Sequence, residues 1–333
     1  MTLEATQSNG KLALPTVWQP LVDQAANALR AFALDEDAKT MIAANPALEQ
    51  IAYQVSKRYV GGQTTIEALA TMERIGQVRN LTVDYMGESC RDRDFANTET
   101  EVILGLIQDI QTRAIPSSIS LDLSHIGSII DIDFAYENAA RIARACQDIG
   151  TEMIISAEQS DRTDLTQKLH ARLCQQFDNV GITVQARLHR TEQDLEKLLE
   201  RPGKIRLVKG AYLESERTSH ARNSPELAQA YRKYAKQLLE STHICSIATH
   251  DRGILDELHQ FILEHKLQTN PYEFEMLLGL WDDQLDLMKA QGHATREYVV
   301  YGKEWFLYVL NRIAEEPVRV YQALVDAVEH GSS

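Results

Sequence analysis

Residues 205–212 read Ile-Arg-Leu-Val-Lys-Gly-Ala-Tyr. The alternation of apolar residues with cations predicts a short strand over Ile205–Lys209, and the small residues Gly210 and Ala211 let the backbone approach a ligand closely. Two cations near the end of a strand suit an anionic cofactor. A plain strand-to-helix turn is the alternative interpretation of this stretch.

Similar short apolar runs recur on both sides of this segment and alternate with longer amphipathic stretches. Including Ile205–Lys209, we count eight strands: Leu81–Tyr85, Ser118–Leu123, Met153–Ala157, Thr183–Arg187, Ser246–Thr249, Tyr272–Met276 and Tyr298–Val300 are the others. The helices expected between them include Asn138–Cys146, Asp164–Phe177, Glu192–Glu200, Pro225–Glu240 and Trp281–Lys289. Strand-helix units indicate a parallel sheet, and eight of them close an α/β fold of the (β/α)8, TIM-like type.

The part of the chain before the first of these strands has a different pattern. We expect a flexible tail over residues 1–16, a helical segment over 17–70, and the barrel over 71–325. Asp35 and Pro46 each stand where a helix would begin, because an acid caps free N–H groups and proline suits the first turn.

Composition excludes several classes of protein. The 333 residues are 44% hydrophobic and carry a formal charge of -14, which disfavours binding to nucleic acid. The four cysteines show no disulfide or zinc spacing, and no G-x-G-x-x-G motif occurs. No signal peptide or membrane-spanning stretch is evident, so we expect a cytoplasmic protein, with peripheral membrane contact left open.

Polar residues gather at the ends of the predicted strands. They are Asp122, Ser156, Glu158, Gln185, Arg187, Arg206, Lys209, Thr249, His250, Glu275 and Tyr298. Burying so many polar groups as mere core filling would be costly, and in such barrels the strand ends form the site. A later predicted helix places Trp305, Tyr308, Arg312 and Glu315 on one face and stops at Pro317, with Asn311 beside the stripe. Alone, that stripe could equally be core packing with a surface ion pair.

Together, these segments resemble the proline dehydrogenase family, whose members are flavoenzymes built on a distorted (β/α)8 barrel. The resemblance runs from Arg58 to Pro317. It is carried by residues 58–62 (RYVGG), 84–88 (DYMGE), 184–186 (VQA), 206–212, 248–250 (ATH), 272–277 (YEFEML) and 298–315.

The resemblance implies FAD bound without a Rossmann unit, and oxidation of a proline ring by hydride transfer to flavin N5. The expected cofactor-binding residues are Gln185, Arg206, Lys209, Gly210, Ala211, Tyr212, Thr249, His250 and Glu275. Tyr298, Tyr308 and Leu277 would wall the substrate ring, while Arg312, oriented by Glu315, would bind its carboxylate. By the same resemblance, a quinone or another flavin oxidant would accept the electrons.

Three positions depart from the family pattern. Asp122 stands where the family has lysine, Ser156 where it has aspartate, and Asn311 where it has the first of two arginines. Losing two charge-assisted contacts would weaken proline binding by about two to four orders of magnitude. We therefore hypothesise that the substrate is a carboxylate-modified or cationic proline derivative.

Other interpretations remain open at this point. Arg187 or His125 could rebuild the carboxylate site in a proline enzyme of lower affinity, or the enzyme could have decayed. From other classes, the chain could be a non-catalytic flavin-binding homologue, or a metal or Schiff-base enzyme that uses Lys209 as the nucleophile.

Overall fold

The structure is a computed structural model, which describes residues 7–8, 11–12, 18–87, 89–222, 224–280, 282–315 and 319–329. Its centre is a closed barrel of eight parallel strands in the order β10-β3-β4-β5-β6-β7-β8-β9. Their bounds are β3 Asn80–Tyr85, β4 Ser117–Leu121, β5 Met153–Ile155, β6 Val180–Gln185, β7 Ile205–Val208, β8 Cys245–Ala248, β9 Tyr272–Leu277 and β10 Thr295–Tyr301. The predicted fold class and all eight predicted strands are confirmed.

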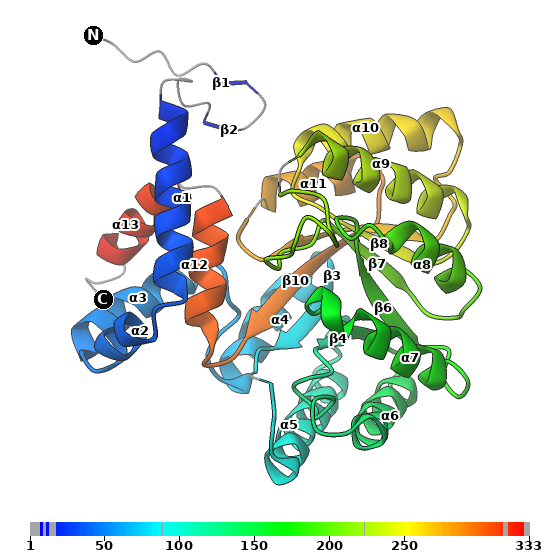
Figure 1. The fold of residues 1–333 in the computed structure, drawn as a ribbon, viewed down its shortest axis with the longest axis horizontal. Helices are drawn as coiled ribbons and strands as arrows, with labels where there is room; N and C mark the ends of the chain where they lie inside the picture. Colours follow the sequence, from blue (N-terminus) through cyan, green and yellow to red (C-terminus); the bar gives the residue numbers. More distant parts are fainter. Residues whose placement is uncertain are drawn as a thin grey trace.

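Helices surround the barrel and bury one apolar face each against it (Figure 1). They are α4 Thr65–Gly76, α5 Arg93–Thr112, α6 Ile132–Asp148, α7 Thr163–Leu173, α8 Thr191–Leu198, α9 Pro225–Glu240, α10 Arg252–Glu264 and α11 Asp282–Ala290, with a 3-10 turn, η2, at Ser160–Arg162. Capping residues fix several starts: the Asp251 side chain accepts the Ile254 N–H at the start of α10. Trp281, expected to open α11, lies outside the described residues.

A separate group of helices packs beside the barrel (Figure 1). It consists of α1 Gln19–Ala33, α2 Glu36–Ala43, α3 Pro46–Ser56, α12 Trp305–Glu315 and α13 Arg319–Glu329. Asp35 caps α2 as predicted, and Pro46 opens α3. Helix α1 lies against α12, where the Phe32 and Phe306 rings are 5.8 Å apart. A helix that precedes the barrel strands, α1, therefore packs against α12, the helix that was expected to bind substrate.

The two-residue strands β1 (Gln7–Ser8) and β2 (Lys11–Leu12) pair within the expected flexible tail. The rest of that tail, and Pro317, which was expected to stop α12, lie outside the described residues.

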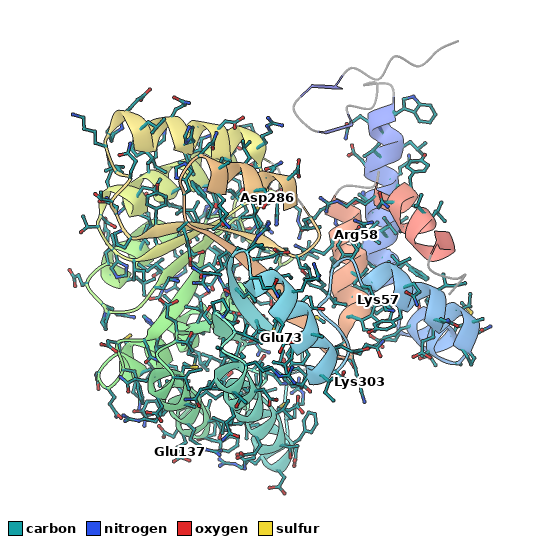
Figure 2. The ribbon with its side chains drawn as sticks, turned by 180° about the vertical axis from the view of Figure 1, so that it is seen from behind. Lys57, Arg58, Glu73, Glu137, Asp286 and Lys303 are labelled. Atoms are coloured by element: carbon teal, nitrogen blue, oxygen red, sulfur yellow. The ribbon has the colours of Figure 1, made fainter. Side chains whose placement is uncertain are left out.

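Figure 2 views the molecule from behind, with Arg58 between the barrel and the helical group. A Cβ on Gly279, which has φ +72°, would lie 1.8 Å from the Arg58 carbonyl oxygen. The Gly61 N–H donates to the Val300 carbonyl at 2.7 Å. Residues 58–62 are thus fitted to the carboxyl ends of β9 and β10, and the close approach at Gly279 leaves no room for a side chain.

Candidate active site

An inward-facing polar layer crosses the middle of the barrel. Arg206 donates from Nε to Thr183 Oγ1 at 3.0 Å and from Nη2 to Ser120 Oγ at 2.7 Å. Its Nη1 lies 3.5 Å from Glu275 Oε1, and the Glu275 carboxylate also accepts the hydroxyls of Thr82 and Ser246 at 2.7 and 2.6 Å. These two residues were predicted at strand ends. Arg206 is instead the second of the four residues of β7, and its side chain is only 4% exposed inside the barrel.

Tyr298, on β10, lies over this layer. Its ring centroid is 4.7 Å from the Arg206 guanidinium carbon; its hydroxyl donates to Asp84, and its oxygen lies 3.1 Å from Ser120 Oγ. Burial, and then the charge of Asp84, raises the pKa of Tyr298 well above its ordinary value, so the phenol stays protonated.

Six of the ten buried polar atoms without a hydrogen-bond partner among the described residues belong to Arg206 in this layer, to residues that end or follow β5 and β6, or to α12. Each of the following is buried without a hydrogen-bond partner among the described residues: Glu158 Oε2, Gln185 Oε1, Arg187 Nε, Arg206 Nη1, Tyr308 OH and Arg312 Nε. Because buried polar groups in proteins nearly always have partners, such a concentration indicates a ligand that completes them. All six belong to residues that the sequence singled out at strand ends or on α12.

Gln185, Arg187 and Gly210 form one side of this region. The Gln185 amide donates to the Glu158 carbonyl at 2.9 Å, while the Arg187 guanidinium donates to the His220 carbonyl at 3.1 Å. Gly210 has φ +107°, and a Cβ there would lie 2.8 Å from Arg187 and 3.0 Å from Gln185 Oε1. The glycine is therefore required by both its backbone conformation and its neighbours.

Predicted cofactor-binding residues that follow β7 and β8 already have hydrogen-bond or ion-pair partners within the chain. The ammonium group of Lys209 pairs with Asp251 at 2.9 Å, and Thr249 Oγ1 accepts the Asp251 N–H at 3.1 Å. The Ala211 carbonyl accepts a hydrogen bond from Arg222. The Asp251 pairing makes Lys209 a poor candidate for a free amine nucleophile.

His250 is held as a neutral ring. Its Nε2 accepts the Leu277 N–H at 3.0 Å, and burial, followed by the charges of Arg312, Arg319 and Lys209, lowers its pKa to about 3. A neutral imidazole that accepts at Nε2 carries its proton on Nδ1. His250 thereby fixes the end of β9, where Leu277 was expected to wall the substrate.

Helix α12 brings the predicted substrate residues to the same end of the barrel. Tyr308 packs in one cluster with Leu277 and Tyr298. Arg312 Nη2 pairs with Glu315 Oε1 at 2.8 Å, and its guanidinium carbon lies 5.3 Å from the Tyr308 ring centroid. The predicted i,i+3 ion pair is present, with the Arg312 side chain mostly buried and Glu315 more open.

Asp122 and Ser156 lie on neighbouring strand ends. Leu121 pairs with Ile155, and the Ser156 N–H donates to the Leu121 carbonyl at 2.9 Å, so Asp122 is level with Ser156. Ser156 Oγ is 2.8 Å from Ser120 Oγ. Strand β4 ends at Leu121, so Asp122 begins the following turn rather than ending the strand as predicted.

Sequence reasoning assigned no role to Asp84, which it quoted only within a motif, and none to Ser120, which supports the site. Asp84 pairs in register with Ser120, and Ser120 contacts both Arg206 and Tyr298. Burial raises the pKa of Asp84, although the hydrogen bond from Tyr298 and the charge of Arg206 oppose the shift. The period-2 alternation Ser118, Ser120, Asp122 is the signal that could have found this inward column.

The described residues hold no cluster of three or more His, Cys, Asp or Glu side chains that would suit a metal ion. Within the same residues, no helix has both the length and the apolar character needed to span a membrane.

Comparison with known proteins gives a consistent picture. The family model described as proline dehydrogenase matches residues 66–316. Proline dehydrogenase 2 of Bacillus subtilis (strain 168) is 31% identical over 265 residues, covering 79% of this chain and 87% of the relative. The proline dehydrogenase of Deinococcus radiodurans is 31% identical over 288 residues, covering 83% of this chain and 92% of the relative.

Solved structures match the fold. Proline utilization A from Bdellovibrio bacteriovorus, inactivated by N-propargylglycine, aligns with a TM-score of 0.76 at 19% identity over 89% of this chain. A mutant proline utilization A from Bradyrhizobium japonicum aligns with a TM-score of 0.69 at 20% identity over 83% of this chain. This chain spans only 37% and 32% of those two proteins.

Proposed function

Because this chain belongs to the proline dehydrogenase family, as the family match over residues 66–316 shows, we propose that it is an FAD-dependent oxidoreductase of L-proline or a proline-like cyclic amine. The observation that carries this proposal is the set of six unpaired buried polar atoms at the carboxyl end of the barrel. They lie where enzymes of this fold place their sites.

The residues present fit a flavin. Arg206 Nη1 and Arg187 Nε are buried donors, and Gln185 Oε1 a buried acceptor, without hydrogen-bond partners among the described residues, and Gly210 packs closely against Arg187 and Gln185. A planar, anionic cofactor with polar ring edges complements this set. In this proposal Arg206 and Gln185 bind the polar edge of the flavin ring, and residues Lys209 to Tyr212 contact the pyrophosphate or adenosine part of FAD.

When bound, FAD supplies the acceptor for a hydride from the ring carbon next to nitrogen, while the ring nitrogen loses a proton and the cyclic imine forms. The chain's own residues position the ring and exclude water. Leu277, Tyr298 and Tyr308 form an apolar and aromatic wall, and Arg312, oriented by Glu315, faces the substituent on the ring. The resemblance favours a quinone as the final electron acceptor.

Glu275 keeps a supporting role in this proposal. Both of its oxygens accept hydroxyl groups and one also faces Arg206, so it orients Arg206 rather than receiving the cofactor itself. We also propose the division into a helical segment over 17–70 and a catalytic barrel over 71–325. Helix α4 crosses the boundary, and α12 shares its packing with α1.

The test is an anaerobic titration of the purified protein, following flavin absorbance while cyclic amines are added. We expect the protein to carry flavin and at least one of L-proline, hydroxyproline, prolinamide and a proline thioester to bleach it. A yellow protein that none of these compounds bleaches would indicate a non-catalytic flavin-binding homologue. A colourless protein that FAD cannot reconstitute would contradict the proposal altogether.

A further inference from the structure

Three carboxylates surround one side of the proposed substrate site. Asp84 is the residue before the last in β3 and pairs with Ser120, Asp122 directly follows β4 level with Ser156, and Glu158 comes two residues after Ser156. Ser120 faces the barrel interior, since it contacts Arg206, Tyr298 and Ser156. Side chains two residues apart on an extended segment share a face, so Asp122 faces inward above Ser120.

The three carboxylates lie at the carboxyl ends of three adjacent strands of the barrel, β3, β4 and β5. Burial, followed by the charges of Asp84 and Glu158, raises the pKa of Asp122 well above its ordinary value. Burial, followed by the charges of Asp122 and Glu158, also raises the pKa of Tyr212, in the segment after β7.

The nearby cations do not balance this group. Arg162 is paired with Glu158 at 3.2 Å, and Arg206 is shared with Glu275 below. Arg312, the cation expected to receive a substrate carboxylate, pairs with Glu315 through Nη2 at 2.8 Å and keeps only Nε without a hydrogen-bond partner among the described residues. Arg187 lies on the Gly210 side, where the cofactor is proposed. A carboxylate placed beside the charged form of Asp122 would be repelled.

One buried acceptor in this group points to a ligand that donates a hydrogen bond. Glu158 is 8% exposed, and its Oε2 has no hydrogen-bond donor among the described residues. An unpaired buried carboxylate oxygen calls for a donor from the ligand, which an amine or amide supplies and a carboxylate does not.

We propose that the substrate of this chain is a cyclic secondary amine with a net positive charge, in which the carboxylate of proline is masked as an amide, ester or thioester or replaced by a second amine. Asp122 then accepts a hydrogen bond from the ring ammonium or from the neighbouring N–H. This inference rests on the proposed function and narrows its substrate class.

The experiment compares kcat/KM for L-proline, L-prolinamide and 3-aminopyrrolidine in the wild-type holoenzyme. We expect at least one of the two cationic compounds to exceed proline about tenfold or more, because a charge-assisted hydrogen bond replaces a repulsion. Turnover of proline equal to or better than that of both cationic compounds overturns the inference and leaves the proposed function intact. Flavin reduction by none of them overturns both.

Variants at Asp122 separate charge from shape. Asp122→Asn keeps the size and should reduce the preference for the cationic compounds about tenfold, while Asp122→Lys should reverse it in favour of proline. If Asp122 were protonated and served as a donor to a carboxylate, Asp122→Asn would leave the preference unchanged, which contradicts the inference. Asp109→Asn, an exposed carboxylate on α5, is the matched control and should retain the wild-type preference. Flavin content and thermal unfolding are measured for every variant.

Discussion

The two ends of the barrel interior are both polar, yet they differ in how completely their charges are paired. At the amino end, the ammonium group of Lys204 contacts Glu273 and Glu152 at 2.7 Å each, and Arg296 Nε contacts Glu273 at 2.7 Å. Arg296 also donates to Ser118 at 3.1 Å. At the carboxyl end and in the layer below it, six buried polar atoms lack hydrogen-bond partners among the described residues. A polar interior alone does not mark a site, whereas a polar interior with unused hydrogen-bond donors and acceptors does.

The largest effect on stability is expected when a cation is removed from the amino end of the barrel, where the charges are paired. Lys204→Met should lower the free energy of unfolding by about 3–5 kcal/mol, because it leaves Glu273 short of one partner in a buried position. Denaturant titration measures this loss. Flavin content and kcat of the folded variant should match the wild type at low temperature. A loss of flavin at unchanged stability would mean that the amino end takes part in the site.

The corresponding removal of a cation from the proposed cofactor site is Arg206→Met. We expect flavin affinity to fall about 10- to 100-fold, equivalent to about 1.5–3 kcal/mol for a charge-assisted hydrogen bond. Glu275 keeps the hydroxyls of Thr82 and Ser246 in this variant, which limits the structural cost. Fluorescence titration of the apoprotein with FAD measures the affinity. An unchanged dissociation constant would remove Arg206 from the cofactor site.

His250, which follows β8 at the carboxyl end of the barrel, should make the stability of the fold depend on pH. Its pKa is lowered to about 3 in the folded chain, so below about pH 6.5 the unfolded chain takes up a proton that the folded chain does not. Stability should therefore fall by about 1 kcal/mol between about pH 7 and about pH 5.5 from this residue. His250→Asn, which can still accept the Leu277 N–H, should flatten that part of the profile. An equally steep profile in the variant would assign the effect elsewhere.

The smallest expected effect comes from Asp122 in the absence of substrate. Its raised folded pKa means that the charged form destabilises the fold at neutral pH and that protonation relieves the cost as pH falls. Asp122→Asn should thus raise Tm by about 2–4 °C, corresponding to about 1 kcal/mol. Calorimetry near neutral pH checks this, with Asp109→Asn expected to leave Tm unchanged. A lower Tm in Asp122→Asn would show that the carboxylate stabilises its surroundings.

Much of the architecture could be predicted from local patterns. Alternation of short apolar runs with amphipathic stretches located all eight strands, and Pro225–Glu240 matches the observed α9. Strand ends were less accurate: Ser118–Leu123 was expected where Ser117–Leu121 is observed. The pairing that ends a strand depends on a neighbour distant in sequence, so a single segment does not specify it.

The site was predictable as a set of residues but not as a set of contacts. Gln185, Arg206 and Arg312 were identified from their positions, and the structure brings them to one end of the barrel. That Glu275 accepts the Thr82 hydroxyl and that Asp84 contacts Tyr298 depend on closure of the barrel, whereas the pairing of Lys209 with Asp251 depends on β7 and β8 being neighbours. Barrel closure juxtaposes β3 and β10, which are about 210 residues apart in the chain.

The packing of α1 against α12 has a consequence for how the chain folds while it is being synthesised. Helix α1 is synthesised before the barrel strands and α12 after them, with about 270 residues between the two helices. Arg30, on α1, donates to the Ala314 carbonyl of α12 at 3.3 Å, and Phe32 packs on Phe306. The nascent chain therefore carries α1 without its helical partner until the barrel strands have been made. A nascent chain that stops before α12 lacks Arg312 and so lacks part of the proposed substrate site.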